Sequence, residues 1–117
     1  MDQLIARRVA VEVIDGVDAV ALGEWPDGTG WSLVFQADDD GYHISNHLGV
    51  GVVNGIREWS VSGRSLHLHF TDEGRASFGS DGLTIWLHED VNLRSAHRAL
   101  RRLISDARQS PIKTKNR

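Results

Sequence analysis

Gly55–Phe70, GIREWSVSGRSLHLHF, carries the most informative pattern of strand residues in the chain. Two runs of alternating apolar residues flank a turn, where Gly63 can supply the positive φ that a type II′ turn needs at its first central position. A hairpin about this turn fixes the facing pairs: Val61–Leu66, Trp59–Leu68 and Arg57–Phe70 on the core face, and Ser60–His67 and Glu58–His69 on the other.

The segments after the hairpin predict a short helix, a strand and a long helix. TDEGRASFG (71–79) favours a helical segment near residues 72–78, and LTIWLH (83–88) alternates like a half-buried strand. In that strand Leu83, Ile85 and Leu87 point inward, and Thr84, Trp86 and His88 point outward. A helix over about residues 91–107 follows, which Asp90 or Asn92 can cap. Its apolar stripe consists of Leu93, Ala96, Leu100, Leu103, Ile104 and Ala107.

The first half of the chain reads as strands and turns. RVAVEVI (8–14) alternates Val9, Val11 and Val13 with polar or small residues, and YHISNHL (42–48) has Tyr42 and Ile44 on one face. The whole pattern predicts an α+β fold: an antiparallel sheet of about six or seven strands with the C-terminal helix packed on one face. We expect one domain over residues 1–108 and a flexible basic tail over residues 109–117.

Composition and charge narrow the classes of function. The chain has no cysteine, which excludes a disulfide framework and a thiolate metal site. Residues 1–90 carry a net charge of −10, from fifteen acids and five bases, and residues 91–117 carry +7, from eight bases and one acid. Charges interrupt the N-terminal apolar residues, so we expect no signal peptide, no membrane span and a cytoplasmic location. The acidic part could attract a basic protein over long range or simply keep the domain in solution.

An outward Trp86 is the residue that most favours a binding surface. It lies on the face that also carries Glu58, His67, His69 and His88, and an exposed tryptophan among polar residues is typical of an interface hot spot. The alternative is that a second layer of structure covers Trp86. The acidic turn Asp38, Asp39 and Asp40 is a second choice of partner-binding surface, on electrostatic grounds.

Two further functions stay open on the residues alone. His67 and His69 share one face of a strand, and His88 could complete a three-histidine metal site in a small metal-binding protein or enzyme. The arginines of the last helix could hold nucleic acid, although aromatic residues for base stacking are few and the acidic part opposes a polyanion. No catalytic signature occurs, so we expect no catalytic residues, no cofactor and no resident metal.

The run Tyr42–Ile104 resembles family ten of the bacterial immunity proteins from polymorphic toxin systems. The resemblance is carried by VGVVNGIREWSV (50–61), SLHLHFT (65–71), TDEGRASFG (71–79), LTIWLH (83–88) and ALRRLI (99–104). Gly74 and Ser77 depart from it, because better helix formers are expected at these positions. The resemblance implies a cytoplasmic, non-enzymatic protein that binds and blocks a cognate toxin domain, and it supplies no catalytic residues.

Overall fold

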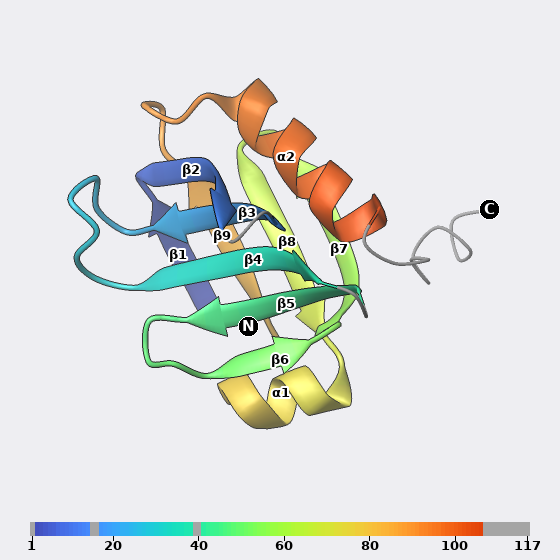
Figure 1. Cartoon of the computed structure of the whole chain (residues 1–117). Helices are drawn as coiled ribbons and strands as arrows, with labels where there is room; N and C mark the ends of the chain where they lie inside the picture. Colours follow the sequence, from blue (N-terminus) through green and yellow to red (C-terminus); the bar gives the residue numbers. More distant parts are fainter. Residues whose placement is uncertain (1, 15–16, 39–40, 107–117) are drawn as a thin grey trace.

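The structure is a computed structural model and describes residues 2–14, 17–38 and 41–106. Within them, nine strands form two sheets and two helices flank these (Figure 1). The five-stranded sheet has the order β2 (Arg8–Ile14), β3 (Val17–Gly23), β4 (Ser32–Asp38), β5 (Gly41–Asn46) and β6 (Gly51–Val53). The four-stranded sheet has the order β1 (Asp2–Ala6), β9 (Gly82–Leu87), β8 (Ser65–Phe70) and β7 (Ile56–Ser62). The helices are α1 (Asp72–Phe78) and α2 (Leu93–Asp106).

The two sheets and α2 share one hydrophobic core. Figure 1 shows the four-stranded sheet behind the five-stranded one, with α2 along one side and α1 at the lower end. α2 packs against β2, β3, β4 and β5, and α1 packs against β6 and β8. The buried side chains come from all these parts and include Phe35, Tyr42, Ile44, Leu66, Leu68, Ile85, Leu100 and Ile104. Neither helix in the described part of the chain is long and apolar enough to cross a membrane.

The α+β class is confirmed, but the predicted single sheet of six or seven strands is wrong. β1 is an additional strand, and it pairs in parallel with β9 while the other strands pair antiparallel. The chain leaves β1 at Ala6 and begins β2 at Arg8, so consecutive strands belong to different sheets. The pattern of the N-terminal residues cannot reveal this, because the partner of β1 lies near the other end of the chain.

The β7–β8 hairpin has the predicted register except at its open end. Four of the five predicted pairs occur, and Gly63 has a φ of +59°. Arg57 does not face Phe70, because a bulge between Ile56 and Glu58 places Ile56 there instead. The bulge puts a buried isoleucine into the core and leaves the arginine exposed, so it avoids burying a charge.

Both predicted helices are present. The Thr71 hydroxyl accepts a hydrogen bond from the Gly74 N–H at 3.1 Å and caps α1. Gly74 is buried, and a β-carbon there would lie 2.8 Å from the carbonyl oxygen of Gly55, which lies between β6 and β7. The close approach of α1 to the β6–β7 connection therefore requires glycine. Asn92, rather than Asp90, caps α2, since its side-chain oxygen accepts from the Ser95 N–H at 3.0 Å.

The apolar stripe of α2 lies on the core as predicted. Ala96, Leu100, Leu103 and Ile104 are buried, while the prediction for Ala107 lies outside the described residues. The predicted tail over residues 109–117 also lies outside them.

Candidate functional site

The outer face of the four-stranded sheet is open to solvent. Apart from the bulge in β7, its strands alternate, and Ala6, Leu66, Leu68, Ile85 and Leu87 are buried on the inner side. Apart from the buried Gly82, the outward residues are exposed or half-buried: Gln3, Ile5, Glu58, Ser60, Ser62, Ser65, His67, His69, Thr84 and Trp86. The face therefore has the composition of a polar surface with two large apolar residues on it.

Trp86 and Ile5 are those two apolar residues, and they are neighbours. The parallel pairing of β1 with β9 places Ile5 directly beside Trp86, with 43% and 47% of their surfaces exposed. On the other side of Trp86, Ser65 of β8 faces it. The prediction that Trp86 points away from the core is thus confirmed, and no second layer covers it in the part of the chain that the structure describes. Ile5 could not be predicted as part of this surface, because no local sequence pattern indicates that β1 exists.

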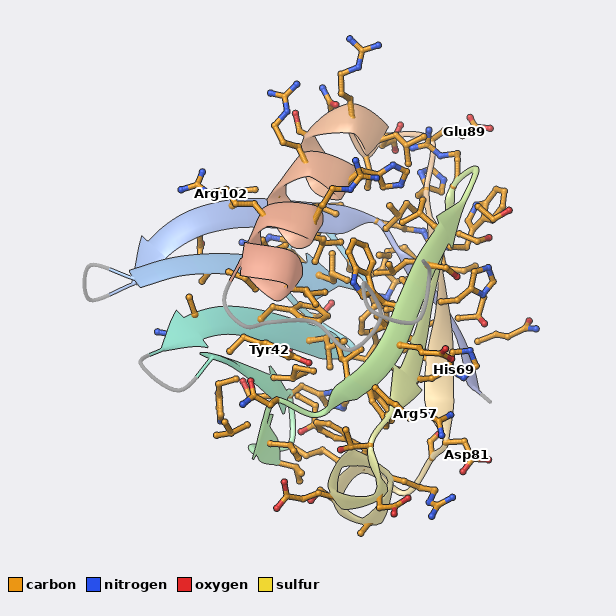
Figure 2. All side chains as sticks on the ribbon, turned by 90° about the vertical axis from the view of Figure 1, so that its right-hand side faces the viewer. Tyr42, Arg57, His69, Asp81, Glu89 and Arg102 are labelled. Carbon is orange, nitrogen blue, oxygen red and sulfur yellow. The ribbon has the colours of Figure 1, made fainter. Side chains whose placement is uncertain are left out.

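On β8, His67 lies near the apolar pair, and His69 lies two residues farther along the strand. His67 faces Thr84, and its Nδ1 lies 3.2 Å from the Thr84 hydroxyl oxygen. His69 faces Glu58 on one neighbouring strand and Gly82 on the other. Figure 2 shows His69 and the nearby Arg57 of the bulge on adjacent strands of this sheet. The two histidines therefore extend the open face from Trp86 toward β7.

His88 does not join this pair. It follows the end of β9, four residues beyond Thr84, so its backbone is about 13 Å from the position opposite His67. The Asp90 N–H donates to its Nδ1 at 3.2 Å, which turns the ring toward the connection before α2. Among the described residues no group of three or more His, Cys, Asp or Glu side chains is arranged to hold a metal ion. The set His67, His69 and His88 is therefore not brought together as one ligand cluster.

The acidic turn lies elsewhere. Asp38 ends β4 in the five-stranded sheet, where it pairs with Gly41. Asp39, Asp40 and the side chain of Asp38 lie outside the described residues, so the second choice of partner-binding surface stays a prediction.

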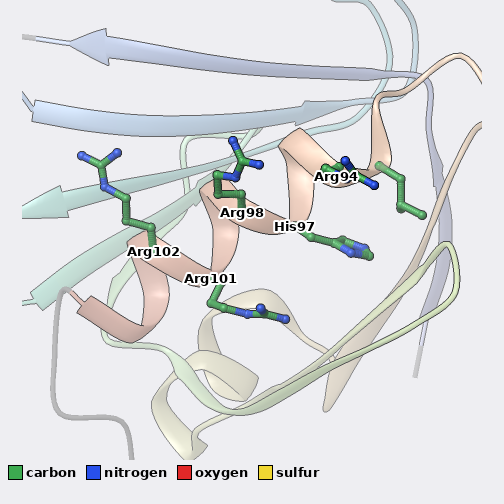
Figure 3. Close-up of a pocket in the computed structure, with 6 residues that line it drawn as sticks. Arg94, His97, Arg98, Arg101 and Arg102 are labelled. Carbon is green, nitrogen blue, oxygen red and sulfur yellow. The ribbon is translucent and has the colours of Figure 1, made fainter.

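α2 carries a second distinctive surface, a row of arginines. Arg94, Arg98, Arg101 and Arg102 line an open hollow of about 740 Å³ together with Leu93 and His97 (Figure 3). No ion pair within the described residues involves Arg94, Arg98 or Arg101. The exposed side of α2 is therefore strongly basic, whereas residues 1–90 are acidic.

His97 lies among these arginines and is half-buried. Its Nε2 is buried and has no hydrogen-bond partner among the described residues. Burial lowers the pKa of His97 below its ordinary value of 6.5, and the positive charges of Arg101 and Arg64 lower it further. The ring is thus held in its neutral form beside a group of cations.

Arg64 links the hairpin to the segment that leads into α2. Its Nε donates to the Leu87 carbonyl at 2.7 Å, and its Nη2 donates to the His88 and Val91 carbonyls at 2.6 and 2.7 Å. In the sequence Arg64 is recognisable only as the residue after the turn glycine Gly63. No local pattern signals its role, because the acceptors lie 23 to 27 residues further along the chain.

No known family model matches this chain, and no curated protein does either. The resemblance to immunity family ten therefore stays a prediction. The fold and the site define an α+β protein with one open sheet face and one basic helix face.

Proposed function

We propose that this protein is an immunity protein that binds a cognate bacterial toxin domain and neutralises it without catalysis. The observation that carries the proposal is the pair of Ile5 and Trp86, side by side and about half exposed on an otherwise polar sheet face. Interfaces between proteins typically place a tryptophan at the centre of a ring of polar residues. Here Ser65 faces Trp86, and His67 faces Thr84 two residues along β9, while His69 and Glu58 lie farther along the same face and His88 follows the end of β9.

A sheet face suits this role because it is pre-organised. Trp86 is held by strand pairing on both sides of β9, and its neighbours in the chain, Ile85 and Leu87, are fully buried. A rigid surface loses little conformational entropy on binding, so more of the contact energy appears as affinity.

The charge distribution favours a basic partner. Residues 1–90 carry a net charge of −10, and opposite charge on a partner accelerates association while salt slows it. We therefore infer a toxin domain with a basic binding surface, and we expect its association rate to fall as ionic strength rises.

The test is a rescue experiment, for which a toxin-like reading frame is first sought next to the gene. Its C-terminal domain is expressed with and without this protein, and binding of the purified pair is measured by calorimetry. Restored growth together with a tight 1:1 complex would support the proposal. A domain that is toxic but is neither bound nor neutralised would exclude that pairing.

A second candidate function is nucleic-acid binding through α2. The hollow lined by arginines favours it, since guanidinium groups bind phosphate in a bidentate way. Titration of a random oligonucleotide at two salt concentrations tests this function, because binding of this kind depends steeply on salt. Arg98→Gln would weaken oligonucleotide binding and leave the toxin complex unchanged, whereas Trp86→Ala would have the opposite effect.

A further inference from the structure

The strand β2 has one open edge. It lies at the end of the five-stranded sheet, and β3 is the only strand that pairs with it in the described part of the chain. Half of the backbone N–H and C=O groups of such a strand point outward and can pair with another strand. β2 contains none of the proline, bulge or inward lysine residues that usually protect an edge.

Apolar surface is exposed along this edge. Val11 lies on the core side of the sheet, opposite the buried Val20, yet 61% of its surface is exposed. Val9 and Val11 also line an open hollow together with Val91, between the edge and the start of α2. The expectation of a half-buried valine face is thus met at Val9 and not at Val11, because nothing in the described chain continues the sheet beyond β2.

We propose that a second copy of this chain continues it. The two β2 strands pair antiparallel about a two-fold axis at Ala10, which joins two five-stranded sheets into one. In this register Arg8 of each copy faces Glu12 of the other, and Val9 of each copy faces Val11 of the other. The strand is therefore complementary to itself in charge and in shape, which is what a symmetric interface requires.

The charges select this register over its neighbours. Moving the strands by one residue would place Val9 opposite Glu12 and mix the two faces of the sheet. Moving the axis to Val11 would place Glu12 opposite Ala10, so that neither charge faces an opposite one directly. In the described chain Arg8 and Glu12 take part in no ion pair, so both are available to the second copy. The interface lies on the five-stranded sheet, whereas Trp86 and Ile5 lie on the four-stranded sheet, so the dimer does not depend on the proposed function.

Charge reversal tests the proposal. Sedimentation equilibrium of the full chain over a concentration series is expected to give a dimer. Arg8→Glu alone and Glu12→Arg alone should each lose it, and the double variant, with both charges exchanged, should regain it. Arg57→Glu, on the other sheet, is the control for the change in net charge and should remain dimeric.

A cross-link tests the register. The chain has no cysteine, so Ala10→Cys introduces a single thiol. Facing residues of an antiparallel pair have Cα atoms about 4.5–5.5 Å apart, within the range for a disulfide. Mild oxidation should therefore link Ala10→Cys into dimers, while Thr29→Cys, in an exposed loop, should stay unlinked. A wild-type chain that sediments as a monomer throughout, or a double variant that fails to regain the dimer, would overturn the proposal.

Discussion

The hydroxyl of Tyr42 both accepts a hydrogen bond from the Ile56 N–H, at 2.9 Å, and donates one to the Ile56 carbonyl, at 3.3 Å. Both residues are buried, and they belong to different sheets, β5 and β7. One side chain thus satisfies both backbone groups of Ile56 at the point where the two sheets meet.

Tyr42→Phe should therefore destabilise the protein although the aromatic ring is kept. Removing the hydroxyl leaves a buried N–H and a buried C=O without a partner, which costs about 1–3 kcal/mol. Urea unfolding measures the loss. Ser60→Ala, which removes an exposed hydroxyl from β7, is the control and should change stability by less than about 0.5 kcal/mol. Equal stability of Tyr42→Phe and wild type would show that water replaces the hydroxyl.

Gly74→Ala should also destabilise the protein, although alanine has a higher helix propensity than glycine. In an exposed helix this change stabilises by about 1 kcal/mol. Here the new β-carbon would lie 2.8 Å from the Gly55 carbonyl oxygen and 3.1 Å from the Phe70 β-carbon. Forcing α1 away from these atoms costs about 1–3 kcal/mol, as overpacking generally does.

The matched control is Ser77→Ala in the same helix. Ser77 is exposed, so the substitution should stabilise by a few tenths of a kcal/mol through propensity alone. Thermal unfolding of both variants separates the two effects. If Gly74→Ala were as stabilising as Ser77→Ala, the close approach of α1 would not constrain residue 74.

These residues show where sequence-based prediction succeeds and where it fails. Local patterns were sufficient for three predictions. The turn at Gly63 gave the register of the β7–β8 hairpin, the alternation around Trp86 gave the direction of its side chain, and the apolar stripe gave the position of α2. The parallel β1–β9 pair and the carbonyl acceptors of Arg64 join segments that are distant in the sequence. Ile5 and the second sheet were missed for that reason, and the candidate site was accordingly predicted with Trp86 but without its neighbour.

Arg64→Lys should destabilise because an ammonium group cannot reproduce the planar fork of the guanidinium. Arg64 reaches three carbonyls at 2.6–2.7 Å, and a lysine loses at least one of these charge-assisted bonds. The expected cost is about 1–3 kcal/mol in urea unfolding. Arg57→Lys, at an exposed arginine of β7, should cost little. Similar small effects of both substitutions would contradict a linking role for Arg64.

Stability should fall with acidity partly because of His97. The pKa of His97 is lowered by burial and then by Arg101 and Arg64, so the unfolded chain binds a proton at higher pH than the folded one. The contribution is complete above the unfolded value of about 6.5 and is lost as pH falls through the lower folded pKa. Urea unfolding from neutral to mildly acidic pH should show a steeper decline for wild type than for His97→Gln. Parallel curves would mean that His97 is accessible to protons in the folded state.

Trp86→Ala should weaken binding of the toxin domain that passes the rescue test and leave the fold intact. A central tryptophan typically contributes 2 kcal/mol or more, so the Kd should rise by about 30-fold or more. Ile5→Ala should act in the same direction and less strongly, because Ile5 lies beside Trp86 and is smaller. Leu48→Ala is the control, since Leu48 is 75% exposed and follows β5 in the other sheet. Calorimetry gives the Kd, and thermal unfolding checks the fold of each variant.

Two outcomes would contradict this prediction. If Trp86→Ala no longer unfolded cooperatively, Trp86 would be a structural residue. If the variant were folded and its Kd were unchanged, the toxin would bind another surface.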